Sequence, residues 1–314
     1  MYKPGVVALR PLSLGDIYDG AFKTIRRNPK AMVGMAALVV AACSLLPALL
    51  SVVLATTGNL TMPTAGESGV AGSGTPELAT LLGSLTTALG QIVLAGMISS
   101  VVFGAVLGRA TSIGEAWAAV HGRVWRLIGL TLLGTTIALL PMILVLLGAI
   151  VLGFALSSVG VGILVGVLGF LGSLVWVVFV GARLLSFATP AMVIERLGVV
   201  ASMRRTWALS SRQFWRIFGI YLLTTLMVGI AGGMLTIPFT IVGIAAGVAG
   251  GGSTTSGLIY VFSNLLGGIV VGAVTSPFQS GVMALLYLDE RIRKEGYDVQ
   301  LIAAAQSGSP ATAG

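Results

Sequence analysis

Charged residues are scarce in this sequence. Aspartate, glutamate, lysine and arginine together account for 9% of its 314 residues, and hydrophobic residues account for 56%. A soluble chain carries about 25% charged residues, so this chain has too little charge to cover a water-exposed surface. The composition therefore predicts an all-α integral membrane protein whose long hydrophobic helices lie in lipid.

Cysteine and histidine are almost absent, with one residue of each. Cys43 lies in an apolar run and has no second cysteine to pair with, so redox chemistry is not indicated. His121 has no other histidine or cysteine near it in the sequence, so a zinc site is not indicated. We interpret His121 as a polar residue of a surface helix, and we predict no catalytic, cofactor-binding or metal-ligating residue.

Long hydrophobic runs are abundant. A helix needs about 20 residues to cross the hydrocarbon core, and the runs that reach this length occupy roughly 31–57, 78–107, 127–156, 160–188, 217–249 and 257–288. They predict six transmembrane helices. Several exceed the minimum length, so tilts or kinks are expected, with four prolines as kink candidates: Pro47, Pro141, Pro238 and Pro277.

The distribution of charge indicates the topology. If the N-terminus is cytoplasmic, the inner segments are 1–30, 108–126, 189–216 and 289–314, and the outer loops are 58–77, about 157–159 and 250–256. Every lysine and arginine then falls in an inner segment or at its margin, while Glu67 and Glu77 carry the only charges in outer loops. This pattern follows the positive-inside rule. It predicts a multi-pass protein of the bacterial inner membrane with both termini cytoplasmic and a disordered end to the tail 289–314.

Two inner segments contain the same helix-start signal. Ser13 is followed three residues later by Asp16, and Ser112 by Glu115, which is the spacing of a capping box. A shift of 90 residues extends the similarity to a third segment, with six identities in 18 positions: Ser112/Ser202, Trp117/Trp207, Ala118/Ala208, Trp125/Trp215, Arg126/Arg216 and Gly129/Gly219. We therefore predict a single membrane domain, 1–314, of three repeats (about 10–107, 109–188 and 195–288), each an amphipathic interfacial helix followed by a transmembrane hairpin.

Basic and aromatic residues of these interfacial helices are the candidate contacts for anionic lipid or a partner. Each basic side chain near an anionic leaflet contributes about 1 kcal/mol, so the cluster Arg204, Arg205, Arg212 and Arg216 would hold its helix at the surface. The other candidates are Trp117, Trp125, Arg126, Arg183, Glu195, Trp207 and Trp215. Arg183 is expected to reach the inner surface and pair with Glu195, or to contact a lipid headgroup. The alternative is that these helices only connect and anchor the spans.

The last predicted span continues directly into a charged segment. Its charges are spaced four apart, as Asp289–Arg293, Glu290–Lys294 and Arg291–Glu295. Such pairs predict that the helix continues, exposed to solvent, until Gly296 ends it. Asp289, Arg291 and Arg293 are candidates for docking a cytoplasmic partner, and salt bridges from the acidic residues to Arg204 and Arg205 are the other possibility considered.

Three segments carry a resemblance to a known family. Residues 183–196 (RLLSFATPAMVIER) with 214–216, residues 286–298 (LYLDERIRKEGYD) and residues 10–19 (RPLSLGDIYD) resemble the membrane domain associated with glycerophosphoryl diester phosphodiesterases. The resemblance spans most of the chain and implies a stand-alone bacterial, notably actinobacterial, member. The phosphodiesterase barrel of that family needs several acidic metal ligands and a histidine acid/base pair, which this chain does not supply.

Three functions are compatible with these features. The first is a non-enzymatic protein that organises anionic lipid, or a membrane protein complex with a cytoplasmic or membrane partner, through its basic interfacial helices. The second is a permease, for which the polar span residues Asn264 and Gln279 would mark the path; Gln91 is a further polar residue within a span. The third is a lipid-processing enzyme using inner-surface carboxylates: Asp16, Asp19, Glu195 and Asp289.

Overall fold

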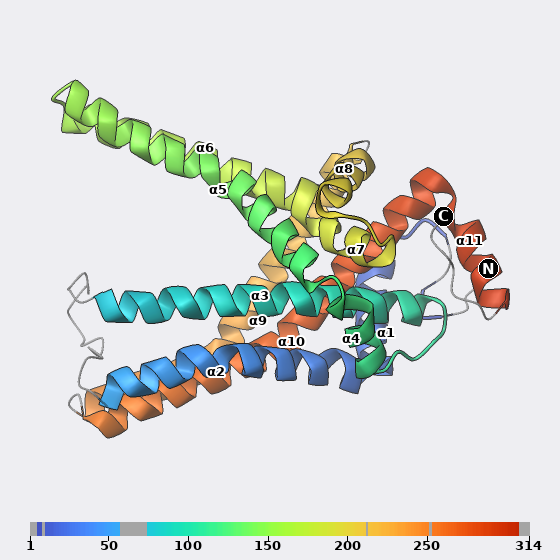
Figure 1. The fold of residues 1–314 in the computed structure, drawn as a ribbon, viewed down its shortest axis with the longest axis horizontal. Coiled ribbons are helices and arrows are strands. Elements are labelled where there is room, and N and C mark those ends of the chain that lie inside the picture. Colours follow the sequence, from blue (N-terminus) through green and yellow to red (C-terminus); the bar gives the residue numbers. More distant parts are fainter. Residues whose placement is uncertain (1–4, 8–9, 57–73, 212, 251–252, 308–314) are drawn as a thin grey trace.

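The computed structural model describes all residues except 1–4, 8–9, 57–73, 212, 251–252 and 308–314 (Figure 1). Every element assigned in the described part is helical, as predicted. The α-helices are α1 (Leu14–Arg27), α2 (Met35–Thr56), α3 (Gly74–Val106), α4 (Ile113–His121), α5 (Val124–Ala155), α6 (Val159–Val180), α7 (Ser186–Ile194), α8 (Val199–Ser210), α9 (Phe214–Ala249), α10 (Thr254–Glu295) and α11 (Tyr297–Ser307). Two π-helical turns, η1 (Lys30–Gly34) and η2 (Gly181–Leu185), precede α2 and α7.

The prediction of six membrane-spanning segments is confirmed. The described residues contain six stretches of helix long and apolar enough to cross a membrane: Lys30–Val53, Gly83–Val106, Val124–Ala155, Val159–Ile194, Phe214–Ala249 and Thr254–Glu295. The four prolines singled out as kink candidates lie inside α2, α5, α9 and α10. The predicted outer loop 58–77 lies largely outside the described residues, and so does the end of the tail.

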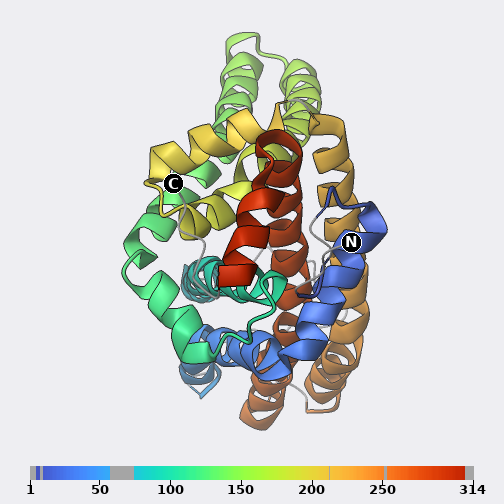
Figure 2. The same ribbon diagram turned by 90° about the vertical axis from the view of Figure 1, so that its right-hand side faces the viewer.

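Helix α10 is the central element of the fold. It packs against α9, α2, α3, α1 and α7, and the end-on view places it inside the ring formed by the other helices (Figure 2). Helices α5 and α6 form a hairpin that packs along its own length and diverges from α2, α3, α9 and α10 away from the short helices (Figure 1). Helices α1 and α11, the first and last helices of the described residues, lie at the same end of the molecule.

Tight packing is concentrated at this end. Ile17, Ile98, Phe187 and Tyr287 are fully buried there, whereas long apolar stretches of α5, α6 and α9 expose their side chains. In lipid such exposed apolar side chains contact acyl chains, so they need no protein partner. The described structure therefore has one well-packed core, at the end where the short helices α1, α4, α7, α8 and α11 gather.

Local sequence explains how the short helices begin. Both predicted capping boxes form. The Ser13 hydroxyl accepts the backbone N–H of Asp16, and the Ser112 hydroxyl accepts that of Glu115. In return, each carboxylate accepts the backbone N–H of its serine. The third helix differs from the prediction. Helix α8 begins after Gly198. The 90-residue shift matches Ser202 to the capping residue Ser112, but Ser202 lies inside α8, where its hydroxyl donates to the Gly198 carbonyl.

Candidate functional site: the charged end of the bundle

We call the end of the molecule that carries α1, α4, α7, α8, α11 and the last turns of α10 the charged end. Most described charged side chains lie there. They form two groups: those in ion pairs within the protein and those that face outward. Four acidic residues, Glu195, Asp289, Glu290 and Glu295, bind arginines within the protein, and Asp289 and Glu290 have no exposed surface. Basic residues such as Arg26, Arg126 and Arg204 face outward.

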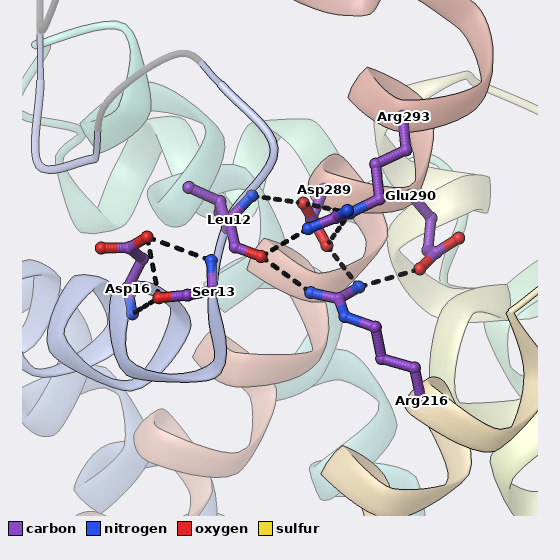
Figure 3. A network of polar contacts seen from close by, with 7 residues as sticks. All are labelled: Leu12, Ser13, Asp16, Arg216, Asp289, Glu290 and Arg293. Atoms are coloured by element: carbon purple, nitrogen blue, oxygen red, sulfur yellow. Dashed lines mark hydrogen bonds and ion pairs between the residues drawn. The ribbon is translucent and has the colours of Figure 1, made fainter.

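The first ion-pair network joins the N-terminal segment to α9 and α10 (Figure 3). The carboxylate of Asp289 accepts the Leu12 backbone N–H at 2.7 Å and lies 2.6 Å from the Arg216 guanidinium and 3.0 Å from that of Arg293. Both arginines also donate to the Leu12 carbonyl, at 2.8 and 2.6 Å, and Arg216 contacts Glu290 at 3.1 Å. The two carboxylates of this network are thus matched by two guanidinium groups. The backbone N–H and carbonyl of Leu12 are both hydrogen-bonded to the network.

The second network joins α7, α8, α10 and α11. Glu195 lies 2.9 Å from the Arg205 guanidinium and 3.2 Å from that of Arg291, and it accepts the Tyr287 hydroxyl. Both arginines also reach Glu295. The Arg291 guanidinium lies 3.6 Å from the centre of the Tyr297 ring, a cation–π contact that places α11 against α10.

These contacts correct the prediction for the charged end of α10. The helix does run to Glu295 and ends at Gly296 in the left-handed conformation (φ 60°), as predicted. It is not solvated over its first charged turn, because Asp289, Glu290 and Arg291 are buried. Charge spacing suggested solvent exposure for this segment, whereas its ion-pair partners Arg216 and Glu195 come from distant parts of the chain.

The predicted four-arginine surface cluster is also divided. Arg204 is exposed, but Arg205 and Arg216 turn inward to bind carboxylates, and Arg212 lies outside the described residues. The salt bridge considered between the tail and Arg205 is present, through Glu295. Because their guanidinium groups are engaged inside the protein, Arg205 and Arg216 are not free to hold a helix on anionic lipid.

Arg183 does not make the predicted pair with Glu195. Its guanidinium carbon lies 3.9 Å from the centre of the Trp207 ring and 5.7 Å from those of Phe179 and Phe214. Its buried Nε has no hydrogen-bond partner among the described residues. Aromatic faces therefore surround this cation where η2 meets α8 and α9, and Glu195 is occupied by other arginines.

A basic cavity lies where the α4–α5 turn meets the α7–α8 link. Its volume is about 210 Å³, and His121, Arg123 and Arg196 line it together with Ala118, Ala119 and Gly122. Partial burial and then repulsion from Arg196 and Arg126 lower the pKa of Arg123. Among the described residues, no carboxylate lies within salt-bridge distance of Arg123, Arg196 or the neighbouring Arg126. The cavity is therefore a concentration of unneutralised positive charge.

The backbone at Arg196 reinforces this interpretation. Arg196 has φ +57°, a left-handed conformation that costs a non-glycine residue energy and that asparagine tolerates best after glycine. A strained residue of this kind is a reason to suspect function. Sequence reasoning missed Arg123 and Arg196, and only the spatial meeting of two links identifies them. Charge alone, among 18 lysines and arginines, gives no signal that selects these two.

Four of the five tryptophans lie at the charged end and face outward. Trp125 and Trp215 are each the second residue of a long helix, α5 and α9, and are 85% and 79% exposed. Trp117 and Trp207, on the short helices before them, are 49% and 46% exposed. Exposed tryptophans at the ends of membrane-spanning helices are typical of the membrane–water interface.

The carboxylates considered for catalysis do not gather into a site. Asp16 closes the capping box of α1, and Asp19 pairs with Lys23 on the same helix. Glu195 and Asp289 belong to the two different networks. Within the described residues, no three histidine, cysteine, aspartate or glutamate side chains are placed to hold a metal ion.

Comparisons with known proteins give no further guide. No protein-family model matches the chain, and neither a curated protein nor a solved structure does so.

Proposed function

We propose that the protein is a multi-pass protein of the bacterial cell membrane whose charged end binds anionic phospholipid, and that through this binding it organises lipid or a membrane protein complex. The observation that carries the proposal is the basic cavity of His121, Arg123 and Arg196. An unpaired cation at the membrane surface attracts anionic headgroups, and guanidinium groups form the strongest hydrogen bonds with phosphate. A volume of about 210 Å³ is that of roughly seven water molecules at about 30 Å³ each, enough for a phosphate group.

The orientation of the charged groups supports the same proposal. Ion pairs within the protein neutralise the buried carboxylates of Asp289 and Glu290 and the nearly buried carboxylate of Glu195. The outward charge that remains is mainly basic, on α1, α8, the first turn of α5 and the links beside them. With both termini in the cytoplasm, this basic surface would face the inner leaflet, where bacterial and other cell membranes display anionic lipid.

The outward tryptophans support a repeat relationship between the second and third units. In the second and third units, Trp125 and Trp215 take the same place in their long helices with nearly the same exposure. Each unit would then present a short helix at headgroup level before a transmembrane hairpin. The proposed repeat is imperfect, since Arg126 is exposed while its counterpart Arg216 binds Asp289.

Membership of the glycerophosphoryl diester phosphodiesterase membrane-domain family is part of the proposal. The three segments that carry the resemblance meet at the charged end, where Leu12 contacts Asp289 and Arg216, and Glu195 contacts Arg291. A shared structural role for these segments would explain why they occur together in one chain. No hydrolytic activity follows from this membership.

A lipid-binding measurement tests the proposal. The protein would be placed in phosphatidylcholine nanodiscs that contain spin-labelled phosphatidylglycerol, and the bound fraction would be compared for Arg196→Asn and Arg204→Asn. Asparagine tolerates the left-handed backbone at 196, so this variant removes the charge with the least backbone strain. We expect Arg196→Asn to weaken phosphatidylglycerol binding roughly tenfold, as for loss of a charged hydrogen bond, and Arg204→Asn to weaken it at most about fivefold.

The contrary results are clear. Equal binding of phosphatidylglycerol and phosphatidylcholine by the unmodified protein would exclude an anionic lipid site. Equal effects of the two variants would show that only diffuse surface charge acts, and that the cavity does not. Single-cysteine labelling from each side of sealed vesicles would test the cytoplasmic placement of the charged end.

A further inference from the structure

A second cavity, lined by uncharged polar groups, lies deeper among the long helices. Its volume is about 410 Å³, and it is formed by α3, α7, α9 and α10. The residues that matter for its chemistry are Gln91, Ser99, Thr189, Tyr221, Ser276 and Gln279. None of its lining side chains is charged. It is thus separate from the basic cavity and from both ion-pair networks.

The polar cavity lies at membrane depth. Gln279 precedes the buried Asp289 by ten residues of α10, which at 1.5 Å per residue places it about 15 Å from the charged end. Gln91 lies fifteen residues before the end of α3 at Val106, or about 22 Å. The hydrocarbon core is about 30 Å thick, so both amides lie within it.

Polar groups at this depth require partners, and the structure leaves several without one. Among the described residues, no hydrogen bond is made by the side-chain amides of Gln91 and Gln279 or by the hydroxyl of Ser276. By contrast, the span amide Asn264, outside the cavity, donates to the Tyr260 carbonyl of its own helix. An unsatisfied polar group in a membrane costs several kcal/mol, so these groups favour an occupant of the polar cavity that forms hydrogen bonds, whether water or a ligand.

Prolines lie within the helices on two walls of the polar cavity. Pro190 in α7 and Pro277 in α10 cannot donate backbone hydrogen bonds, and this leaves the carbonyls of residues 186 and 273 without their helical donors. The π-helical turn η2 lies directly before α7. Irregular helix at membrane depth is tolerated where it lines a cavity and is frequent at binding sites.

We propose that the polar cavity binds an uncharged polyhydroxyl group, as in a sugar or a polyol, either free or as a lipid headgroup. Amides and hydroxyls offer both donors and acceptors, which match hydroxyl groups that also donate and accept. The ring of Tyr221, with Pro190 and Met283, supplies the apolar surface against which the C–H face of such a ligand packs. An ionised ligand would find no counter-charge in this lining.

Binding to the intact protein in nanodiscs tests this inference. Glucose and glycerol serve as free probes, detected by saturation-transfer NMR, and monoglucosyl diacylglycerol in phosphatidylcholine serves as the lipid-borne probe, detected by native mass spectrometry. Gln279→Leu and Gln91→Leu each remove one amide, and Asn264→Leu is the matched control. We expect each cavity variant to weaken binding of the effective probe at least about fivefold, the equivalent of one hydrogen bond, and the control variant to leave it unchanged.

The outcomes separate the possible sources of the ligand. Binding of a free probe identifies a solute, and binding of the glycolipid alone identifies a headgroup. Binding of neither would show a cavity that holds water only and would overturn the inference, as would equal effects of Gln279→Leu and Asn264→Leu. Thermal unfolding of each variant is measured beside binding, and Gln279→Asn, which keeps the amide but shortens its reach, replaces Gln279→Leu if that variant unfolds.

The inference is independent of the lipid-binding proposal. Arg196→Asn should leave binding of the polyhydroxyl probe unchanged, and Gln279→Leu should leave phosphatidylglycerol binding unchanged. Failure of one proposal therefore does not imply failure of the other.

Discussion

The buried carboxylate of Asp289 gives the sharpest test of how the charged end is held together. Its side chain has no exposed surface and contacts Leu12, Arg216 and Arg293 at 3.0 Å or less. In Asp289→Asn the remaining amide oxygen can still accept the Leu12 N–H. The negative charge is lost, which leaves two guanidinium groups beside one carboxylate, Glu290.

The expected destabilisation follows from the burial of the partners. Removing one member of a buried ion pair costs about 3–5 kcal/mol. Arg216 and Arg293 retain 27% and 26% exposure, and solvent screens part of the stranded charge, so we expect about 2–3 kcal/mol. At about 2–4 °C per kcal/mol, the apparent Tm should fall by roughly 5–10 °C.

Thermal unfolding in nanodiscs, followed by tryptophan fluorescence, would measure this change. The matched control is Asp19→Asn, which removes an exposed i,i+4 pair with Lys23 and should lower the Tm by no more than about 2 °C. Adding Arg216→Gln to Asp289→Asn should cost less than the sum of the single changes, because the two groups contact each other. A Tm for Asp289→Asn equal to that of the control would refute the reasoning.

Two further predictions concern local structure. Hydrogen bonds from the Ser13 backbone N–H and hydroxyl, with a smaller contribution from Arg10, lower the pKa of Asp16 despite some desolvation. The stability that the cap contributes is therefore complete above the unfolded-state pKa of about 3.9. It is lost as the pH falls through the lower pKa of the folded state. The protection factors of the first α1 amides, which correct for the intrinsic pH dependence of exchange, should fall only below about pH 4 in the unmodified protein and should be low at every pH in Asp16→Ala. A fall already at pH 6 would contradict this. In the α5–α6 hairpin, a Cβ on Gly169 would lie 2.0 Å from Val145 Cγ1, whereas Gly172 has open space. Gly169→Ala should thus lower the Tm and Gly172→Ala leave it equal or raise it, and equal Tm values would argue against this packing of the hairpin.

The sequence by itself determined the features that depend on neighbouring residues. Runs of apolar residues specify six helices long enough to cross a membrane, because the lipid core requires a minimum length of satisfied backbone. The pairs Ser13–Asp16 and Ser112–Glu115 start α1 and α4, and Gly296 ends α10, since caps act within one turn of helix.

Only the tertiary structure decided the partners of the charges and the cavities. Leu12 and Asp289 are 277 residues apart, and neither hydropathy nor charge spacing indicates that they touch. Because the sequence does not show such distant contacts, it predicted that the charged last turns of α10 are exposed to solvent and that Arg216 is available to lipid. The basic cavity needs two separate links and the polar cavity four helices, and sequence patterns of period 3.6 carry no information on which helices become neighbours.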